Sequence, residues 1–374
     1  MRCKFSRGRI KAAPLRGEPI FQLSLLFLPP TAERDDSKNN AENNNDSECK
    51  NMMQKVGYCD FKTYVKVLEK FIFNTEKLGI DGLAKQYRKL ESQGDVSLTF
   101  DAFKQNMTKN RYSDVICRDS TRVKLLIDST QQGDYIHANY VNSKVLRNTY
   151  ICTQGPLQTT ISDFWRMVFQ ERTTSILMLC RPIEEGRPKC VVYWPDEGQE
   201  LCYGCIRVLN KCEKMDDSNS FETVNLVVNF EGTAIPEKEQ PNDKSELNVT
   251  LIKWPNWPDR GVPDEKCHTV PHKLLAMVRH GPCVVHCSAG IGRTGCMIAL
   301  EFAHRMLSQG EYVDFEKIAL ELRKQRAQCI QTEVQYLYIH RVMVAFARGE
   351  NGISADAQTA ADNFLRSYDE HLKR

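Results

Sequence analysis

The sequence predicts a mixed α/β fold, a twisted mixed β-sheet flanked by helices. β-branched or alternating apolar runs, which are typical of strands, gather in the middle of the chain. Apolar residues at helical spacing occur on both sides of these runs, and a sheet covered by helices from both ends is a mixed α/β domain. The expected strands are 175–180, 189–194, 202–209, 221–230 and 247–254, and the expected helices are 160–172, 272–279, 293–307, 315–326 and 333–347.

The chain divides into three parts by composition. Residues 35–51 are mainly Asn, Asp, Glu, Ser and Lys, and they cannot bury enough apolar surface to fold. Residues 61–90 show helical spacing, and Gly79 and Gly82 are expected to divide this stretch into two helices. We therefore expect a disordered N-terminal tail over 1–55, one folded domain over 56–348 that begins with these helices, and a polar C-terminal tail over 349–374 with one short helix.

Overall composition argues against several classes of protein. Of the 374 residues, 41% are hydrophobic and 26% are charged, as in ordinary soluble globular proteins. A net charge of +3 gives no reason to expect nucleic-acid binding, and no run reaches the roughly 18 apolar residues that a membrane helix needs. Residues 20–28 are apolar behind a basic start, but Gln22 and Ser24 interrupt them, so we do not interpret them as a secretory signal.

The cysteines indicate a reducing compartment. There are 15 of them, an odd number with no repeating spacing, which does not resemble a small disulfide scaffold. Cys202 and Cys205 form a CxxC pair inside an expected strand, but one pair of ligands does not complete a zinc site. We expect a cytoplasmic protein whose cysteines are mostly buried apolar residues, with no metal site.

The strongest signal in the chain is the sequence VVHCSAGIGRTG at residues 284–295. A β-branched strand runs into a glycine-rich loop, and the loop runs into a helix. The residues between Cys287 and Arg293 can curl around a tetrahedral oxyanion, because Gly290 and Gly292 allow unusual dihedral angles and let backbone N–H groups point inward. The positive end of the following helix faces the same point.

This arrangement predicts a nucleophilic cysteine. The same fixed dipoles that stabilise a phosphate dianion stabilise a thiolate, so the pKa of Cys287 should lie well below that of a free thiol. Arg293 offers a planar fork for two phosphate oxygens, which a lysine could not match, and Thr294 places a hydroxyl near the sulfur. An incidental buried cysteine would not explain why the surrounding glycines, arginine and threonine fit one constellation.

HCSAGIGRTG resembles the signature loop of the protein tyrosine phosphatase family, in its tyrosine-specific rather than its dual-specificity branch. The resemblance covers roughly residues 75–348 and implies a single, non-receptor-type catalytic domain. It also implies hydrolysis of phosphotyrosine in proteins during signal transduction, through a phosphocysteine and without metal or organic cofactor. Other segments typical of the family follow in the expected order: KNRY at 109–112, QGP at 154–156, FW at 164–165, WPD at 257–259, and QT at 331–332 with Gln335.

The resemblance also implies which residue is the general acid. Asp259 lies in WPNWPDRGVP, where prolines and a glycine flank Trp257, as expected of a loop that swings as one piece over a ligand. A positioned carboxylic acid typically contributes about 10²–10⁴-fold by protonating a leaving oxygen. A second WPD triplet ends at Asp196, but it closes an expected strand and lacks the following GVP, so we reject it.

The remaining assignments follow from the same resemblance. Gln331 and Gln335 match the glutamines that position the attacking water, with Asp259 then acting as base. Tyr112 matches an aromatic wall that favours phosphotyrosine over the shorter phosphoserine, and Asp114 matches the carboxylate that fixes the substrate backbone. The expected phosphate-binding loop is Ser288, Ala289, Gly290, Ile291 and Gly292; in addition, Glu184 is expected to orient Arg293, and Lys189 to approach the acid loop.

Some positions depart from the family pattern. His137 stands where the family usually carries Asn, and Arg260 stands where His or Phe is common. Gln328 is bulky at a position where a glycine opens a second pocket in some members. The stretch between Asp259 and Cys287 is short, so the helix near residues 274–278 is expected to be trimmed.

Two other functions remain open. A catalytically silent phosphotyrosine-binding module would keep the fold but lose the Cys, Arg or Asp, and all three are present here. A dual-specificity or lipid phosphatase would use the same loop, but the Tyr112 segment and the paired glutamines argue against it. The sequence does not predict the oligomeric state or the physiological substrate.

Overall fold

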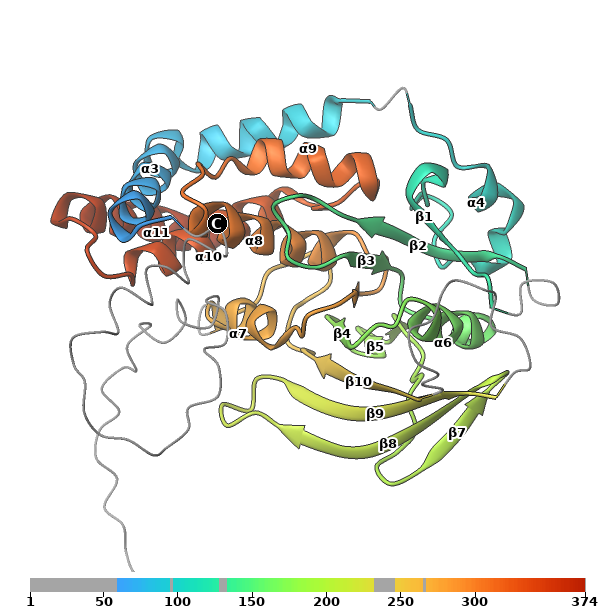
Figure 1. The fold of residues 1–374 in the computed structure, drawn as a ribbon. Helices are drawn as coiled ribbons and strands as arrows, with labels where there is room; N and C mark the ends of the chain where they lie inside the picture. Colours follow the sequence, from blue (N-terminus) through green and yellow to red (C-terminus); the bar gives the residue numbers. More distant parts are fainter. Residues whose placement is uncertain (1–58, 95–96, 128–132, 232–245, 265–266, 374) are drawn as a thin grey trace, which may run out of the picture.

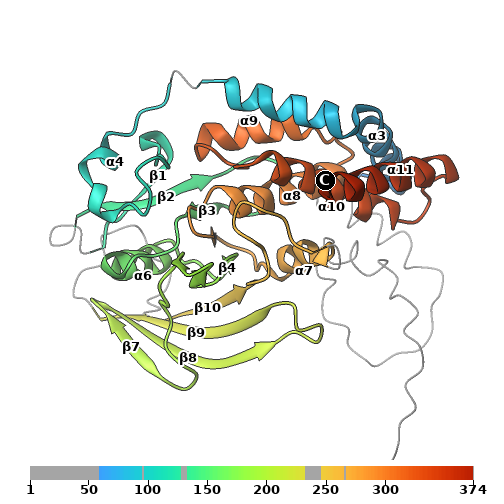
Figure 2. The same cartoon turned by 180° about the vertical axis from the view of Figure 1, so that it is seen from behind.

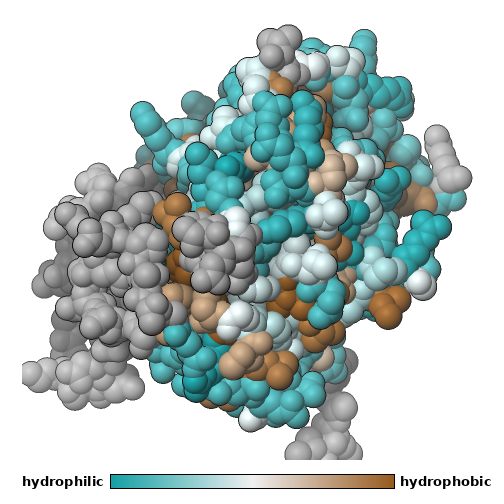
Figure 3. Space-filling view, turned by 90° about the vertical axis from the view of Figure 1, so that its right-hand side faces the viewer, coloured by the Kyte–Doolittle hydropathy of each residue, from teal (hydrophilic) through white to brown (hydrophobic). Residues whose placement is uncertain are grey.

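The structure is a computed structural model that describes residues 59–94, 97–127, 133–231, 246–264 and 267–373. The predicted N-terminal tail and the apolar run at 20–28 lie outside these residues. No helix in the described ranges is long and apolar enough to cross a membrane. On the face drawn in Figure 3 most of the visible surface is hydrophilic, with hydrophobic side chains in small areas between.

The centre of the molecule is a mixed nine-stranded sheet in the order β1-β2-β3-β11-β4-β10-β9-β8-β7. Strands β3, β11, β4 and β10 run parallel to one another, and the pairs towards both edges are antiparallel. The strands are β1 (Arg122–Lys124), β2 (Tyr135–Val141), β3 (Tyr150–Thr153), β4 (Ser175–Met178), β7 (Glu200–Tyr203), β8 (Ile206–Met215), β9 (Glu222–Phe230), β10 (Glu246–Lys253) and β11 (Cys283–His286).

Helices from both ends of the chain cover one side of this sheet, where α3, α8, α9, α10 and α11 lie together in Figures 1 and 2. Helix α6 packs instead against β2, β7, β8 and β9. The helices are α3 (Phe61–Ser92), α4 (Asp101–Gln105), α6 (Ile161–Gln170), α7 (Val270–Met277), α8 (Gly292–Ser308), α9 (Phe315–Gln325), α10 (Glu333–Arg348) and α11 (Ala355–Leu372), with short 3-10 turns at Met107–Lys109, Asp119–Thr121 and Gln158–Thr160.

Strand β11 places the signature loop at the centre of the fold. It pairs with β3 on one side and β4 on the other, so that Val284 is level with both Ile151 and Ile176. All four residues of β11 are buried, as expected of a central parallel strand that is covered on both faces. The chain leaves the carboxyl end of this strand at His286 and enters α8 at Gly292. This is the edge at which parallel sheets usually bind ligands.

The N-terminal helical stretch bends at one of its two glycines. Gly79 has φ 60° and ψ −177°, which is outside the helical region, whereas Gly82 continues the helix. The prediction of two helical segments is therefore confirmed at Gly79 and wrong at Gly82. The bend is a natural place for glycine, because these angles are accessible to almost no other residue.

Two predicted strands differ from the structure. Residues 189–194 form no regular strand, because the amides of Lys189 and Val191 bond to the carbonyls of Pro182 and Pro156 in loops rather than to a neighbouring strand. A small hairpin of β5 (Ile183–Glu184) and β6 (Arg187–Pro188) precedes them. The run 202–209 forms two strands, β7 and β8, because Gly204 turns the chain with φ 64°.

The C-terminal segment is longer and better packed than predicted. In place of one short helix in a polar tail, residues 355–372 form the 18-residue helix α11, which packs on α3 and α10. Its buried face consists largely of alanines at helical spacing, with Phe364 and Tyr368. The first and last helices of the described chain therefore support each other, joined also by a hydrogen bond from the Ser354 amide to the Glu69 carboxylate.

Candidate active site

The loop between β11 and α8 wraps around the sulfur of Cys287. The Gly290 amide donates to Cys287 Sγ at 3.3 Å, and Gly290 has φ 71°. A Cβ atom at Gly290 would lie 2.0 Å from the carbonyl oxygen of Thr153 at the end of β3, so only glycine fits there. The loop thus takes its shape from direct contact with the neighbouring strand.

Several groups lower the pKa of the Cys287 thiol. Burial alone would raise it, but the positive charge of Arg293, the Thr294 hydroxyl and the amides of Thr294 and Gly290 outweigh burial and hold the pKa below its ordinary value. The Thr294 hydroxyl is buried without a conventional hydrogen-bond partner among the described residues, which leaves it to the sulfur. A thiolate is the nucleophilic form of cysteine.

Arg293 is fixed in a single orientation. Its guanidinium binds both oxygens of Glu184, with Nη1–Oε1 at 2.6 Å and Nη2–Oε2 at 3.1 Å, and Nη1 also donates to the carbonyl of Trp257 at 2.7 Å. A bidentate pair of this kind gives directional as well as electrostatic stabilisation. Its side chain is almost fully buried, so the charge acts at low dielectric on the adjacent sulfur.

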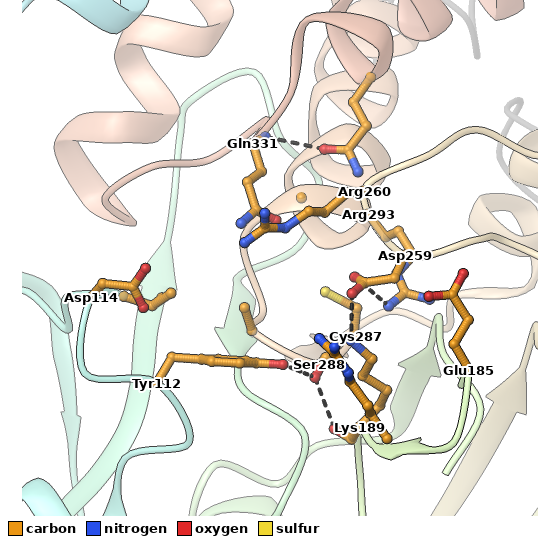
Figure 4. Close-up of a pocket in the computed structure, with 15 residues that line it drawn as sticks. Tyr112, Asp114, Glu185, Lys189, Asp259, Arg260, Cys287, Ser288, Arg293 and Gln331 are labelled. Atoms are coloured by element: carbon orange, nitrogen blue, oxygen red, sulfur yellow. Dashed lines mark hydrogen bonds and ion pairs between the residues drawn. The ribbon is translucent and has the colours of Figure 1, made fainter. Parts of the chain in front are cut away.

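Asp259 faces the same arginine. Its Oδ1 lies 3.1 Å from Arg293 Nη2, and its Oδ2 lies 2.5 Å from Lys189 Nζ (Figure 4). Burial alone would raise the pKa of this carboxyl, but Lys189, Arg293 and Arg260 together hold it below its usual value. Asp259 is therefore a carboxylate that bridges two cations.

These groups open into one cavity of about 310 Å³. On one side Tyr112 donates to or accepts from Ser288 Oγ at 2.8 Å, and Ser288 Oγ donates to the carbonyl of Lys189 at 3.1 Å (Figure 4). Asp114 stands at the exposed mouth next to Tyr112. The lining comprises Tyr112, Asp114, Val115, Glu185, Arg187, Lys189, Asp259, Arg260, Cys287, Ser288, Ala289, Gly292, Arg293, Gln331 and Gln335.

The side chains of Gln331 and Gln335 lie beside the loop at the point where it enters α8. Gln335 Oε1 accepts from the Gln331 amide at 3.1 Å. A Cβ atom at Gly292 would lie 2.8 Å from Gln335 Oε1 and 3.1 Å from Gln331 Oε1, so this glycine leaves room for both side chains beside the loop. Four predicted residues are not among those that line the cavity: Glu184, Gly290, Ile291 and Thr294.

A buried cysteine, an arginine held by a bidentate carboxylate and a second carboxylate thus meet at one cavity. The family model for protein-tyrosine phosphatase matches residues 106–345. The chain belongs to the protein-tyrosine phosphatase family. The nine-stranded mixed sheet with its flanking helices is the fold of its structural neighbours in this family.

Similar members of the family include receptor enzymes and solved domains. Human receptor-type tyrosine-protein phosphatase F is 36% identical over 287 residues, 73% of this chain, and the mouse protein is 38% identical over 252 residues. The chain spans only 14% of the length of the human relative. A solved structure of PTPN18, described for its fingerprint on distinct HER2 tyrosine phosphorylation sites, is 32% identical and covers 71% of this chain and 94% of its own, with a TM-score of 0.61. A PTPN18 complex with HER2 phosphopeptides covers the same share of this chain at 31% identity.

One buried residue that supports the signature loop of this phosphatase domain cannot be recognised from the sequence. Arg326, at the end of α9, is buried, and it donates to the carbonyls of Gly290 at 3.1 Å and Ala289 at 2.9 Å. The same guanidinium bonds Asn139 Oδ1 at 2.8 Å and His137 Nδ1 at 3.1 Å. In the sequence it resembles any basic residue in the last turn of a helix, so only the fold reveals its role.

Three of the departures from the family pattern can be located in the structure. His137 is buried, and its Nε2 lies 2.8 Å from the Val115 carbonyl. Gln328 has φ 61° and donates to the Asp114 carbonyl at 3.1 Å, so it supports the mouth of the cavity. Helix α7 has only eight residues.

Two other motifs lie away from this site. Asp196 is exposed and outside the cavity lining. Cys202 and Cys205 lie at the β7–β8 turn, and no group of three or more potential metal ligands occurs among the residues that the structure describes.

Proposed function

We propose that this chain hydrolyses phosphotyrosine in proteins through a phosphocysteine intermediate, with Cys287 as nucleophile. The observation that carries the proposal is that Cys287, Arg293 and Asp259 line one cavity, with the pKa of the Cys287 thiol held low. A nucleophile, a phosphate-binding cation and a proton donor are the three roles that transfer of a phosphoryl group from an ester requires.

In the first step the Cys287 thiolate attacks phosphorus, so that an S–P bond forms and the P–O bond to tyrosine breaks. The guanidinium of Arg293 and the loop amides bind the equatorial oxygens, where charge develops. The proton of Asp259 passes to the departing phenolic oxygen. Phosphotyrosine becomes tyrosine, and the enzyme holds a phosphocysteine.

The low pKa of Asp259 agrees with an acid role once the charge of a substrate is considered. Lys189 and Arg293 favour its carboxylate form. A phosphate dianion would neutralise Arg293 and place negative charge beside Asp259, and both changes favour its protonated form. Substrate binding itself would therefore bring the proton to the place where it is used.

In the second step water attacks phosphorus and the S–P bond breaks. Asp259 takes the proton of the water, phosphate leaves, and the thiolate is restored. Gln331 and Gln335 are suited to orienting this water, because both approach the helical end of the loop. No metal or other cofactor takes part in either step as proposed.

The substrate class follows from the depth of the site. Cys287 is only 3% exposed, and Tyr112 forms one wall of the cavity that leads to it. A tyrosyl phosphate is long enough to reach the sulfur along an aromatic wall, whereas phosphoserine is too short. The PTPN18 complex with HER2 phosphopeptides supports a peptide-borne substrate. We further propose a reducing, cytoplasmic location, because a thiolate nucleophile is readily oxidised.

The proposal is tested with a phosphotyrosine peptide and three proteins. The wild type should release phosphate, and Cys287→Ser should bind the peptide without releasing phosphate. Asp259→Ala should turn over slowly and retain the peptide, which also makes it suitable for trapping substrates from a native extract. Unchanged phosphate release by Cys287→Ser would refute the proposed function. Binding without turnover by the wild type would favour the silent phosphotyrosine-binding module instead.

A further inference from the structure

One hydroxyl connects the segment of Asp259 with the helix of Gln335. Thr332 Oγ1 donates to the carbonyl oxygen of Arg260 at 3.1 Å, between residues 72 positions apart in the chain. The same oxygen accepts from the Gln335 amide at 3.3 Å, as the N-cap of α10. Thr332 therefore contacts the neighbours of both the proposed acid and a proposed water-positioning glutamine.

The segment that Thr332 contacts is a compact turn. The Gly261 amide donates to the Pro258 carbonyl at 3.3 Å, and the indole of the buried Trp257 donates to the Gly261 carbonyl at 3.0 Å. Arg260 has φ 55°, which is uncommon for a residue with a side chain and gives the turn a defined shape. Because residues 257–261 are bonded to one another, a bond to the Arg260 carbonyl also restrains Asp259.

The bonds that hold this turn over the cavity differ in how they depend on charge. Two of them are ion pairs of the Asp259 carboxylate, with Lys189 and Arg293. Both weaken when Asp259 is protonated, which is the state required for an acid. The bonds from Arg293 to the Trp257 carbonyl and from Thr332 to the Arg260 carbonyl do not use the carboxylate.

We propose that Thr332 is a positioning residue that holds the acid turn over the cavity when Asp259 carries its proton. The inference rests on the proposed function, because it takes Asp259 as the general acid. Its hydroxyl acts through the Arg260 carbonyl and does not touch the reacting atoms. Loss of this hydrogen bond reduces the fraction of complexes in which Asp259 reaches the leaving oxygen.

Two substitutions separate this role from helix capping. Thr332→Ser keeps a hydroxyl that can both cap and donate. Thr332→Asp keeps a good N-cap acceptor but has no proton to donate to the Arg260 carbonyl. Both proteins should therefore unfold close to the wild-type temperature, and a scan of thermal unfolding checks this.

The readout is kcat/KM for aryl phosphates whose leaving groups differ in pKa, from 4-nitrophenyl phosphate to phenyl phosphate. Phenol leaves poorly without a proton, whereas 4-nitrophenol needs it much less. Thr332→Asp should lose about two- to tenfold more activity on phenyl than on 4-nitrophenyl phosphate, the size expected for one hydrogen bond. Thr332→Ser should restore the wild-type ratio.

The added negative charge of Thr332→Asp weakens binding of both dianions. It also favours the protonated form of Asp259, which would help the poorer leaving group and so acts against the expected loss on phenyl phosphate. An equal loss on the two substrates, or no loss, would overturn the role of Thr332 while leaving the proposed function intact. If the wild type itself fails to turn over the phosphotyrosine peptide, the proposed function fails, and this inference fails with it.

Discussion

The ammonium of Lys189 lies 2.5 Å from one carboxylate oxygen of Asp259, and the guanidinium of Arg293 lies 3.1 Å from the other (Figure 4). The residue assigned to donate a proton is thus held in its ionised form by two neighbouring cations. This relationship gives the first prediction, because the pH dependence of kcat/KM reports the ionisation of the free enzyme.

Replacing Lys189 by methionine should move the basic limb of the kcat/KM profile to higher pH. Removal of the cation stabilises the protonated form of Asp259, so its pKa rises and the acid stays protonated over a wider range. The measurement is a pH series with a phosphotyrosine peptide. A limb that stays in place, or moves to lower pH, would show that Lys189 does not control the acid.

Glu184→Gln should lower kcat/KM about 10- to 100-fold without unfolding the protein. The glutamine amide accepts through one oxygen only, so one of the two charge-assisted hydrogen bonds from Arg293 is weakened and the other is lost, and such bonds are worth about 1.5–3 kcal/mol. Glu185→Gln is the matched control, because the neighbouring Glu185 makes no ion pair among the described residues. Equal losses of kcat/KM in both variants would mean that activity depends on negative charge near the mouth of the cavity and not on the orientation of Arg293.

Acid should destabilise the protein through His137. Burial, with a smaller contribution from Arg326, lowers the pKa of His137 to about 3 in the folded protein, against about 6.5 in an unfolded chain. The unfolded state therefore takes up the proton first, so the stability from this group is complete above about pH 6.5 and is lost as pH falls towards 3.

At about pH 5 this loss should be about 2 kcal/mol. His137→Asn, which introduces the residue usual in the family, should flatten the dependence of unfolding free energy on pH. Urea unfolding of both proteins at about pH 7 and pH 5 measures it. Identical pH dependence in the two proteins would contradict the assignment.

The two glycines of α3 should respond differently to substitution by alanine. Gly79→Ala should destabilise the protein by about 1–3 kcal/mol, because the backbone at φ 60° and ψ −177° is strained for any residue with a Cβ. Gly82 continues the helix, and an added Cβ would meet only the Leu78 side chain at 3.3 Å, so Gly82→Ala should be neutral or stabilising. Thermal unfolding of both variants is sufficient, and a destabilised Gly82→Ala with an unaffected Gly79→Ala would reverse the interpretation.

The elements that the sequence predicted well are those whose own burial pattern determines them. The expected strands at 175–180 and 247–254 and the expected helices over 293–307 and 333–347 agree with β4, β10, α8 and α10 to within a few residues. Strand β10 alternates buried and exposed residues over most of its length, β4 is a short run that is buried throughout, and α8 and α10 carry apolar residues at helical spacing. The signature loop could be located because its glycines, cysteine and arginine have to fit one backbone path around an anion.

The features that escaped prediction depend on partners far away in the chain. Residues 189–194 look like a strand, but the loop carbonyls of Pro156 and Pro182 take their amides. Helix α11 looks like a tail, because alanines form much of its buried face and give little hydropathy contrast. Arg326 looks like a surface residue, and only the fold brings it under the loop at Ala289 and Gly290.

Titration of Cys287 tests the central proposal most directly. The thiolate absorbs in the ultraviolet, so the difference in absorbance between the wild type and Cys287→Ser, followed against pH, isolates this one group among the cysteines. The amides of Gly290 and Thr294 and the charge of Arg293 should keep its midpoint below the ordinary thiol value, with thiolate present at neutral pH and vanadate bound competitively. A Cys287 thiol that is fully protonated at neutral pH, in a protein with no affinity for vanadate, would contradict it.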